Sequence, residues 1–121
     1  MVTTISVAMC THNGARFVAE QVRSILAQTV AVDELVVSDD ASSDETIAVI
    51  EREIAAAATP PRLRVLRNNP ALGVVKNFEQ ALTATSGELV ALSDQDDVWH
   101  RDRIATALAV LLFLLALRRS G

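Results

Sequence analysis

The segment from Asp94 to Asp97 places three carboxylates within four residues, directly after an apolar run at 89–92. Like charges this close repel one another unless a cation lies among them. Carboxylate oxygens are the ligands that Mg²⁺ and Mn²⁺ prefer, and a catalytic magnesium commonly uses one or two protein carboxylates together with substrate phosphates. The segment therefore predicts a divalent cation that holds a phosphate ester. The alternative is a solvated acidic loop, which is what most charge clusters are.

No glycine cradle for phosphate accompanies these carboxylates. The patterns G-x-G-x-x-G and G-x-x-x-x-G-K-[ST] are absent from the sequence, and Gly14 stands alone after the first apolar run. Because carboxylates and phosphates are both anions, the acidic residues can serve a phosphate ester only through a metal ion between them. Such an ion would act as a Lewis acid that stabilises charge on a departing diphosphate.

The elements that must position these residues alternate along the chain. Hydrophobic spacing predicts strands at 5–9, 34–38, 63–66 and 89–92, and helices at 15–28, 42–57, 75–85 and from about 102. Strands that alternate with helices predict an α/β fold, a doubly wound and mostly parallel sheet with helices on both faces. Ligands bind such sheets outside the carboxyl ends of the strands.

Three polar groups then fall at one edge of the predicted sheet. Thr11, His12 and Asn13 follow the first strand, Asp39 and Asp40 follow the second, and the acidic segment follows the fourth. Because parallel strands end at the same edge, we expect the three groups to share one site.

Local signals predict how the helices begin, end and face. Ser42 and Glu45 have the spacing of a capping box at the start of the second helix. Gly87 is placed to end the third helix. In the first helix the apolar positions follow helical spacing, which puts Gln21 and Ser24 on the opposite, outer side.

The composition of the chain limits the classes of molecule that it can bind. The chain has 121 residues, long enough for one domain, and 50% are hydrophobic while only 3% are aromatic. A net charge of −4 and a single lysine, Lys76, exclude the basic surface of a nucleic-acid binder. The single cysteine, Cys10, lies in an apolar run and is interpreted as a small core residue rather than a nucleophile. Thr3, Thr4 and Ser6 interrupt the start of a secretory signal, so we expect a cytoplasmic location.

The tail at 104–121 forms a segment of its own. Between Ile104 and Leu117 the one polar residue is Thr106, and Arg118 and Arg119 follow. As a helix this stretch is about 21 Å long, against about 30 Å for a bilayer core, so it is not expected to span. A helix that is apolar all round must be buried in protein or lie in lipid. We therefore expect a homodimer through this helix, or association with the inner face of the membrane.

Four segments in order carry a resemblance to a known family. They are SVAMCTHNG at 6–14, VVSDDASSD at 36–44, GVVKNF at 73–78 and LSDQDDVW at 92–99. Together they resemble the N-terminal, nucleotide-sugar-binding half of the family 2 glycosyltransferases, whose sheet is of the GT-A type. The last segment is similar to that of bacterial rhamnosyltransferase-type members.

The resemblance implies a binding domain over 1–103 for a UDP- or dTDP-linked sugar, and a divalent metal, Mg²⁺ or Mn²⁺. It implies these nucleotide-binding residues: Thr11, His12, Asn13, Asp39, Asp40, Lys76, Asp94 and Asp96. Within this set Thr11 and Asp39 would contact the nucleobase, Asp96 the ribose or diphosphate, and Asp94 would support them. Asp97, together with Asp96, would hold the metal. Polysaccharide biosynthesis is the process that such transferases serve.

The chain departs from the family pattern at three points. His12 stands where the family usually has tyrosine, and its imidazole can still stack on a pyrimidine. Lys76 stands for an arginine and lacks the bidentate fork. The family's acceptor-binding half and catalytic base lie beyond the last residue, and Asp102 is the one spare carboxylate, so no catalytic residue is assigned. We therefore expect the donor-binding half of an inverting glycosyltransferase from a truncated gene, inactive alone. A non-catalytic nucleotide-sugar-binding remnant and a nucleotidyltransferase are the alternatives.

Overall fold

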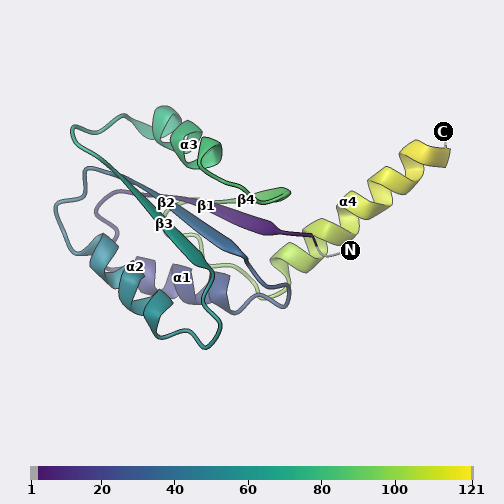
Figure 1. Ribbon diagram of the computed structural model, residues 1–121, viewed down its shortest axis with the longest axis horizontal. Coiled ribbons are helices and arrows are strands. Elements are labelled where there is room, and N and C mark those ends of the chain that lie inside the picture. Colours follow the sequence, from purple (N-terminus) through teal and green to yellow (C-terminus); the bar gives the residue numbers. More distant parts are fainter. Residues whose placement is uncertain (1–2, 121) are drawn as a thin grey trace.

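A computed structural model describes residues 3–120 as a parallel sheet with helices, which confirms the predicted α/β fold (Figure 1). The elements are β1 (Ile5–Thr11), α1 (Val18–Leu26), β2 (Glu34–Asp40), α2 (Thr46–Ala55), β3 (Arg62–Asn68), α3 (Val74–Thr83), β4 (Leu89–Ser93) and α4 (Arg103–Ser120). Their order along the chain is the predicted one. All four strands are longer than their apolar runs suggested, the first three by two or three residues and β4 by one.

The four strands lie in the order β3-β2-β1-β4, and every neighbouring pair is parallel. The chain builds outward from β1 through β2 to β3 and then crosses over to place β4 on the other side of β1. In the register of the sheet, Ser6 lies opposite Glu34 on one side and opposite Val90 on the other. The strand order thus reverses between β1 and β4, and sheets of this kind bind ligands at such a point.

Helices cover the two faces of the sheet unequally. α1 and α2 lie on one face and α3 on the other (Figure 1). Alternate residues of β1 explain this arrangement, because Val7 and Met9 pack into the larger core beneath α1 and α2, whereas Ala8 and Cys10 pack against α3. The large aliphatic core therefore lies under α1 and α2, and small residues let α3 approach the sheet closely.

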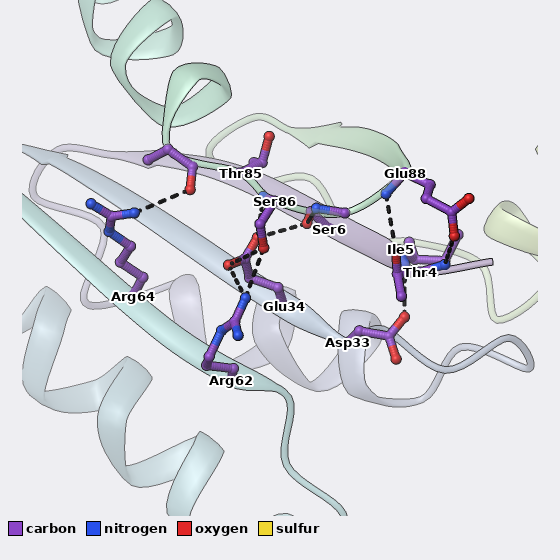
Figure 2. A network of polar contacts seen from close by, with 12 residues as sticks. Thr4, Ile5, Ser6, Asp33, Glu34, Arg62, Arg64, Thr85, Ser86 and Glu88 are labelled. Atoms are coloured by element: carbon purple, nitrogen blue, oxygen red, sulfur yellow. Dashed lines mark hydrogen bonds and ion pairs between the residues drawn. The ribbon is translucent and has the colours of Figure 1, made fainter. Parts of the chain in front are cut away.

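Glu34 ties several elements together at the amino-terminal edge of the sheet (Figure 2). Its carboxylate accepts hydrogen bonds from Ser6 Oγ at 2.7 Å, Arg62 Nη2 at 2.8 Å, and the backbone N–H of Ser86 at 2.8 Å. Burial alone would raise the pKa of Glu34, but these hydrogen bonds outweigh burial and lower that pKa to about 2. One ionised side chain thus joins β1, β2, β3 and the turn before β4.

Gly87 has a different reason to be glycine from the predicted one. α3 ends at Thr83, so Gly87 does not terminate it. The N–H of Gly87 donates to Ser6 Oγ at 2.8 Å, and an added Cβ would lie 2.6 Å from that oxygen. The glycine is needed because the turn passes directly against β1, a contact that the sequence pattern could not reveal.

The predicted capping box is also wrong. α2 begins at Thr46, and the side chain of its N-cap residue, Glu45, makes no capping hydrogen bond. Ser42 instead donates to Asp39 Oδ1 at 2.6 Å, while Asp44 accepts the N–H of Thr46 at 3.0 Å. Ser42 belongs to the loop at the end of β2 rather than to the helix.

The predicted outward position of Gln21 is contradicted as well. Gln21 is fully buried and Ser24 is half-buried, because the segment between β4 and α4 lies over this side of α1. Helical spacing identified the apolar face correctly but could not show what covers the polar one.

α4 projects away from the sheet (Figure 1). Ile104 is buried and Leu108 packs against the core, whereas the helix is exposed from residue 109 to its end. Leu112 and Phe113 are 65% and 63% exposed. Among the helices of residues 3–120, none combines the length and the hydropathy needed to cross a membrane.

Candidate functional site

A pocket of about 240 Å³ opens where the strand order reverses, at the carboxyl ends of β1, β2 and β4. It is lined by Cys10, Thr11, His12, Asp40, Val74, Asn77, Phe78, Asp94 and Gln95. Members of all three predicted polar groups therefore meet in one place, and the first turns of α3 supply the remaining wall.

The first predicted group divides between pocket and loop. The His12 ring lines the pocket, and its Nδ1 lies 2.6 Å from the backbone oxygen of Asp40, so a proton on Nδ1 completes a hydrogen bond. Asn13 instead holds the neighbouring loop, since its Oδ1 accepts the N–H of Ser43 at 2.8 Å. These contacts fix the end of β1 against the end of β2.

The two carboxylates at the end of β2 have different surroundings. Asp39 is buried, and its Oδ1 accepts the hydroxyls of Thr11 and Ser42, both at 2.6 Å. It borders a neighbouring depression with Ser42 and Arg67 rather than the pocket described above. Asp40 faces the pocket itself.

Asp40 also fixes the wall of the pocket. Its carboxylate accepts the N–H groups of Leu72 at 2.7 Å and Gly73 at 3.0 Å, and the Asn68 amide at 3.0 Å. Burial of Asp40 raises the pKa of its carboxyl, but these hydrogen bonds and the nearby His12 outweigh burial and hold that pKa below its ordinary value. The ionised carboxylate thereby orders the loop that leads into α3.

The acidic segment forms a turn beside the pocket. The N–H of Asp97 donates to the carbonyl of Asp94 at 3.1 Å. Gln95 connects this turn to β1, because its Oε1 accepts the N–H of His12 at 2.7 Å. Asp97 Oδ2 accepts the indole N–H of Trp99 at 3.0 Å. One oxygen of Asp97 is thereby occupied by the protein, and Asp96 is exposed.

The donor set fits a cation that is shared with a ligand. Within residues 3–120, no three acidic, histidine or cysteine side chains come close enough to enclose a metal ion by themselves. Mg²⁺ commonly takes only one or two carboxylates and completes its shell with water and substrate phosphates. The carboxylates of Asp96 and Asp97 suit that arrangement.

Backbone strain concentrates at the same edge. In the described part of the chain, the non-glycine residues with positive φ are Asn13 at 48°, Ala41 at 58° and Asp96 at 67°. Each lies in a loop that follows one of the strands at the site. Left-handed conformations are unfavourable for residues with a Cβ and persist where surrounding contacts impose them, often at binding sites.

Lys76 is not brought to the pocket. It is exposed and lines a separate depression with Arg64 and Glu79. Cys10 lies in the pocket wall, but burial, with smaller contributions from Asp94 and Asp40, raises the pKa of its thiol to about 12. The thiol therefore stays protonated at neutral pH and is no nucleophile.

Sequence reasoning left three lining residues without a role. Gln95 lies between the carboxylates of the acidic segment, and Phe78 is the last residue of the GVVKNF segment. Asn77 is fixed by accepting the Ser38 hydroxyl at 2.6 Å and by donating to the Ser38 carbonyl at 3.0 Å. Its place beside Lys76 in the GVVKNF segment was the available signal.

Comparisons with known proteins agree on one family. The model of the family described as Glycosyl transferase family 2 matches residues 6–113. The dTDP-rhamnosyl transferase RfbG of Shigella flexneri is 32% identical over 109 residues, which cover 87% of this chain and 37% of that protein. An Escherichia coli protein, the UDP-Glc:alpha-D-GlcNAc-diphosphoundecaprenol beta-1,3-glucosyltransferase WfgD, is 31% identical, with 89% of this chain and 41% of that protein covered.

A solved structure supports the same grouping. The mannosyltransferase PcManGT from Pyrobaculum calidifontis, in complex with GDP-Man and Mn²⁺, superposes with a TM-score of 0.79 at 29% identity. The superposition covers 89% of this chain and 32% of that chain. The present chain thus spans about two-fifths or less of the length of the proteins that it matches.

Proposed function

Because the chain belongs to glycosyltransferase family 2 and has its GT-A fold, we propose that it binds the nucleotide-diphosphate part of a UDP- or dTDP-linked sugar in the pocket between β1 and β4. One observation carries this proposal: His12, Asp40 and Asp94 come from three different strand ends and line the same pocket. The relatives RfbG, a dTDP-rhamnosyl transferase, and WfgD, a UDP-Glc-dependent glucosyltransferase, support the choice of donors.

Each wall of the pocket has a part in donor binding. His12 and Phe78 offer flat rings for a pyrimidine, and Asp40 and Asn77 offer polar atoms at fixed positions. Asp39 supports this wall by holding Thr11 and Ser42 in place. Lys76 would reach the nucleotide only from the outer side of α3.

Asp96 and Asp97 would hold Mg²⁺ or Mn²⁺ together with the diphosphate. The bound cation would stabilise the negative charge that develops on the departing nucleoside diphosphate. PcManGT, which was solved with Mn²⁺, supports a divalent cation in this fold. The chain's own contribution is the fixed turn, since the hydrogen bonds of Asp94 and Trp99 define where Asp97 lies.

We assign donor binding, not acceptor activation, to residues 1–103. Transfer of the sugar to an acceptor hydroxyl, in polysaccharide synthesis on the cytoplasmic side of the membrane, is the activity that we propose for the whole enzyme. A non-catalytic nucleotide-sugar binder is the second candidate, because both carboxylates that line the pocket, Asp40 and Asp94, are assigned here to donor binding, which leaves neither as a base for an acceptor.

Calorimetry on the 121-residue chain tests donor binding. We expect weak binding of UDP or dTDP in the presence of Mn²⁺ or Mg²⁺, and none in excess chelator. Equal affinity with and without the chelator would contradict the metal assignment, and no binding in either condition would contradict the proposed function. Incubation with a UDP-linked sugar and measurement of UDP release then distinguishes a transferase or hydrolase from a binder.

A further inference from the structure

Polar side chains along α1 hold the segment that connects β4 to α4. Gln21 and Ser24 lie on α1, and Gln28 lies two residues beyond its end. Their spacing of three and four residues places them on one side of the helix. The segment from 94 to 102 contains no strand or helix, so its backbone groups need partners from elsewhere. These three side chains supply such partners.

Gln21 contacts the segment at its site end. Its Nε2 donates to the backbone oxygen of Asp94 at 2.6 Å and to Ser93 Oγ at 2.8 Å. The same Asp94 oxygen accepts the N–H of Asp97 and thereby closes the acidic turn. The Gln21 amide is thus bonded directly to the atom on which the turn depends.

The orientation of this amide shows which of its groups the fold requires. Gln21 is fully buried, and its Oε1 has no hydrogen-bond partner within the described chain. A buried acceptor without a partner is unfavourable. The side chain is nevertheless held by the two bonds that its amide nitrogen donates, so the contact with Ser93 and Asp94 outweighs the unpaired oxygen.

Gln28 makes two hydrogen bonds at the far end of the segment, and a third to the backbone oxygen of Ser24 at 3.1 Å. Its Nε2 donates to the backbone oxygen of His100 at 2.7 Å, and its Oε1 accepts the N–H of Ile104 at 3.0 Å. Between the two, Ser24 Oγ accepts the N–H of Trp99 at 2.9 Å. Gln28 therefore secures the start of α4, away from the carboxylates.

We propose that Gln21 is a positioning residue for the metal and donor site, acting through the Asp94 carbonyl to hold the turn that carries Asp96 and Asp97. Gln28 holds the other end of the same segment and has no such role. This proposal rests on the proposed function, in which Asp96 and Asp97 hold the cation. Partners behind a metal ligand commonly change metal affinity when they are removed.

Two matched substitutions test the proposal. Each substitution removes one buried amide at similar volume: Gln21→Met removes two hydrogen bonds, and Gln28→Met removes three. Calorimetry would measure UDP affinity in the presence of Mn²⁺, and thermal unfolding would measure stability. We expect Gln21→Met to weaken binding about tenfold, and Gln28→Met to leave affinity within about twofold at a similar loss of thermal stability. Unchanged affinity in Gln21→Met, or an equal loss in Gln28→Met, would overturn the proposal.

Hydrogen exchange without ligand provides a second measurement. We expect the amides of residues 94–98 to exchange faster in Gln21→Met than in Gln28→Met, and equal rates would overturn the proposal. If the parent chain bound no nucleotide, the proposed function would fail while this measurement still decided the role of Gln21. Should Gln21→Met not fold, Ser93→Ala removes one of its two acceptors. We then expect a smaller loss of affinity, and an unchanged affinity would count against the proposal.

Discussion

At the residue scale, the site carboxylates differ in how far the protein already uses them. Asp39 accepts hydrogen bonds from Thr11 and Ser42, and Asp40 accepts them from the loop before α3. Asp97 shares one oxygen with the Trp99 indole and keeps the other. Carboxylates that already hold backbone and hydroxyl donors shape a pocket, whereas one with a free oxygen can bind a cation.

Asp97→Asn should weaken metal-dependent nucleotide binding by at least about tenfold and leave the fold intact. The substitution removes the charge that a divalent cation requires, while an amide oxygen can still accept the Trp99 indole N–H. Calorimetry with UDP and Mn²⁺ measures the affinity, and circular dichroism measures the fold. Glu79→Gln, on the exposed side of α3, is the control for the loss of one negative charge. If Asp97→Asn bound as the parent does, or unfolded, the ligand assignment would be wrong.

Much of the site could be predicted from residue types at strand ends, because parallel strands necessarily end together. Thr11, His12, Asp40 and Asp94 were placed in this way. Lys76 could not be, since a shift of one or two residues along a helix decides whether a side chain faces the pocket or the outside. The role of Gln21 could not be predicted either, because its hydrogen-bond partners, Ser93 and Asp94, are distant in the sequence.

At the element scale, Glu34 connects the strands at the amino-terminal edge of the sheet. It is 4% exposed and receives donors from β1, β3 and the turn before β4 (Figure 2). Because these hydrogen bonds stabilise the ionised form, the Glu34 carboxyl group loses its proton more readily in the folded protein than in the unfolded chain. The stability of the whole sheet is therefore coupled to the ionisation of this one side chain.

Glu34→Gln should lower the free energy of unfolding at neutral pH by roughly 2 to 4 kcal/mol, from the size of the pKa shift. Folding lowers the pKa of Glu34 from its ordinary 4.5 to about 2. Its contribution to stability is thus fully present above about pH 5. That contribution is lost as the pH falls from 4.5 to about 2. In Glu34→Gln this acid-dependent loss should shrink. Urea unfolding at several pH values between 2 and 7 measures both effects.

Glu53→Gln is the matched control for this prediction. Glu53 also pairs with an arginine, Arg23 of α1, at 2.7 Å, but Arg23 is 67% exposed. An ion pair open to solvent contributes little, so the change should be much smaller. Similar losses of unfolding free energy in the two variants would contradict the prediction that the buried position of Glu34 makes its ion pair more stabilising.

The order of the elements followed from the sequence because each one has a hydrophobic period that depends on local residues alone. Features set by partners distant in sequence did not follow. The sequence predicts that Gly87 ends a helix, but Gly87 is required because its backbone approaches Ser6. The sequence likewise predicts Ser42 as a helix cap, but Ser42 donates a hydrogen bond to Asp39. Such positions depend on the packed sheet, which no local pattern encodes.

At the scale of the whole molecule, α4 is the exception to a well-covered core. Its first residues pack against the sheet, and the rest of the helix is exposed around its circumference. Each exposed leucine leaves roughly 1.5 to 3 kcal/mol of burial unrealised. Several together rival the net stability of a small domain. We therefore retain the prediction that this helix associates with a second copy or with a membrane surface.

Sedimentation of the full chain beside a chain ending at Ala109 tests this prediction. The shorter chain keeps Ile104 and Leu108, which pack against the core, and removes the exposed part. We expect the full chain to dimerise or to bind lipid vesicles. The shorter chain should remain a monomer and should not bind vesicles. Leu112→Gln with Leu115→Gln, in the full chain, should act in the same direction without removing the helix. Monomers in all three cases would contradict the prediction.

The position of β4 determines when the four-stranded sheet is complete during synthesis. β1, β2 and β3 leave the ribosome in the order in which they pair, but Ile5 of β1 has its other neighbour at Leu89. One edge of β1 therefore stays open until residues 89–93 have been made, and an open edge is where foreign strands add. The pocket between β1 and β4 is formed last. A nucleotide that binds there would stabilise chains in which β4 has paired with β1 over chains in which it has not.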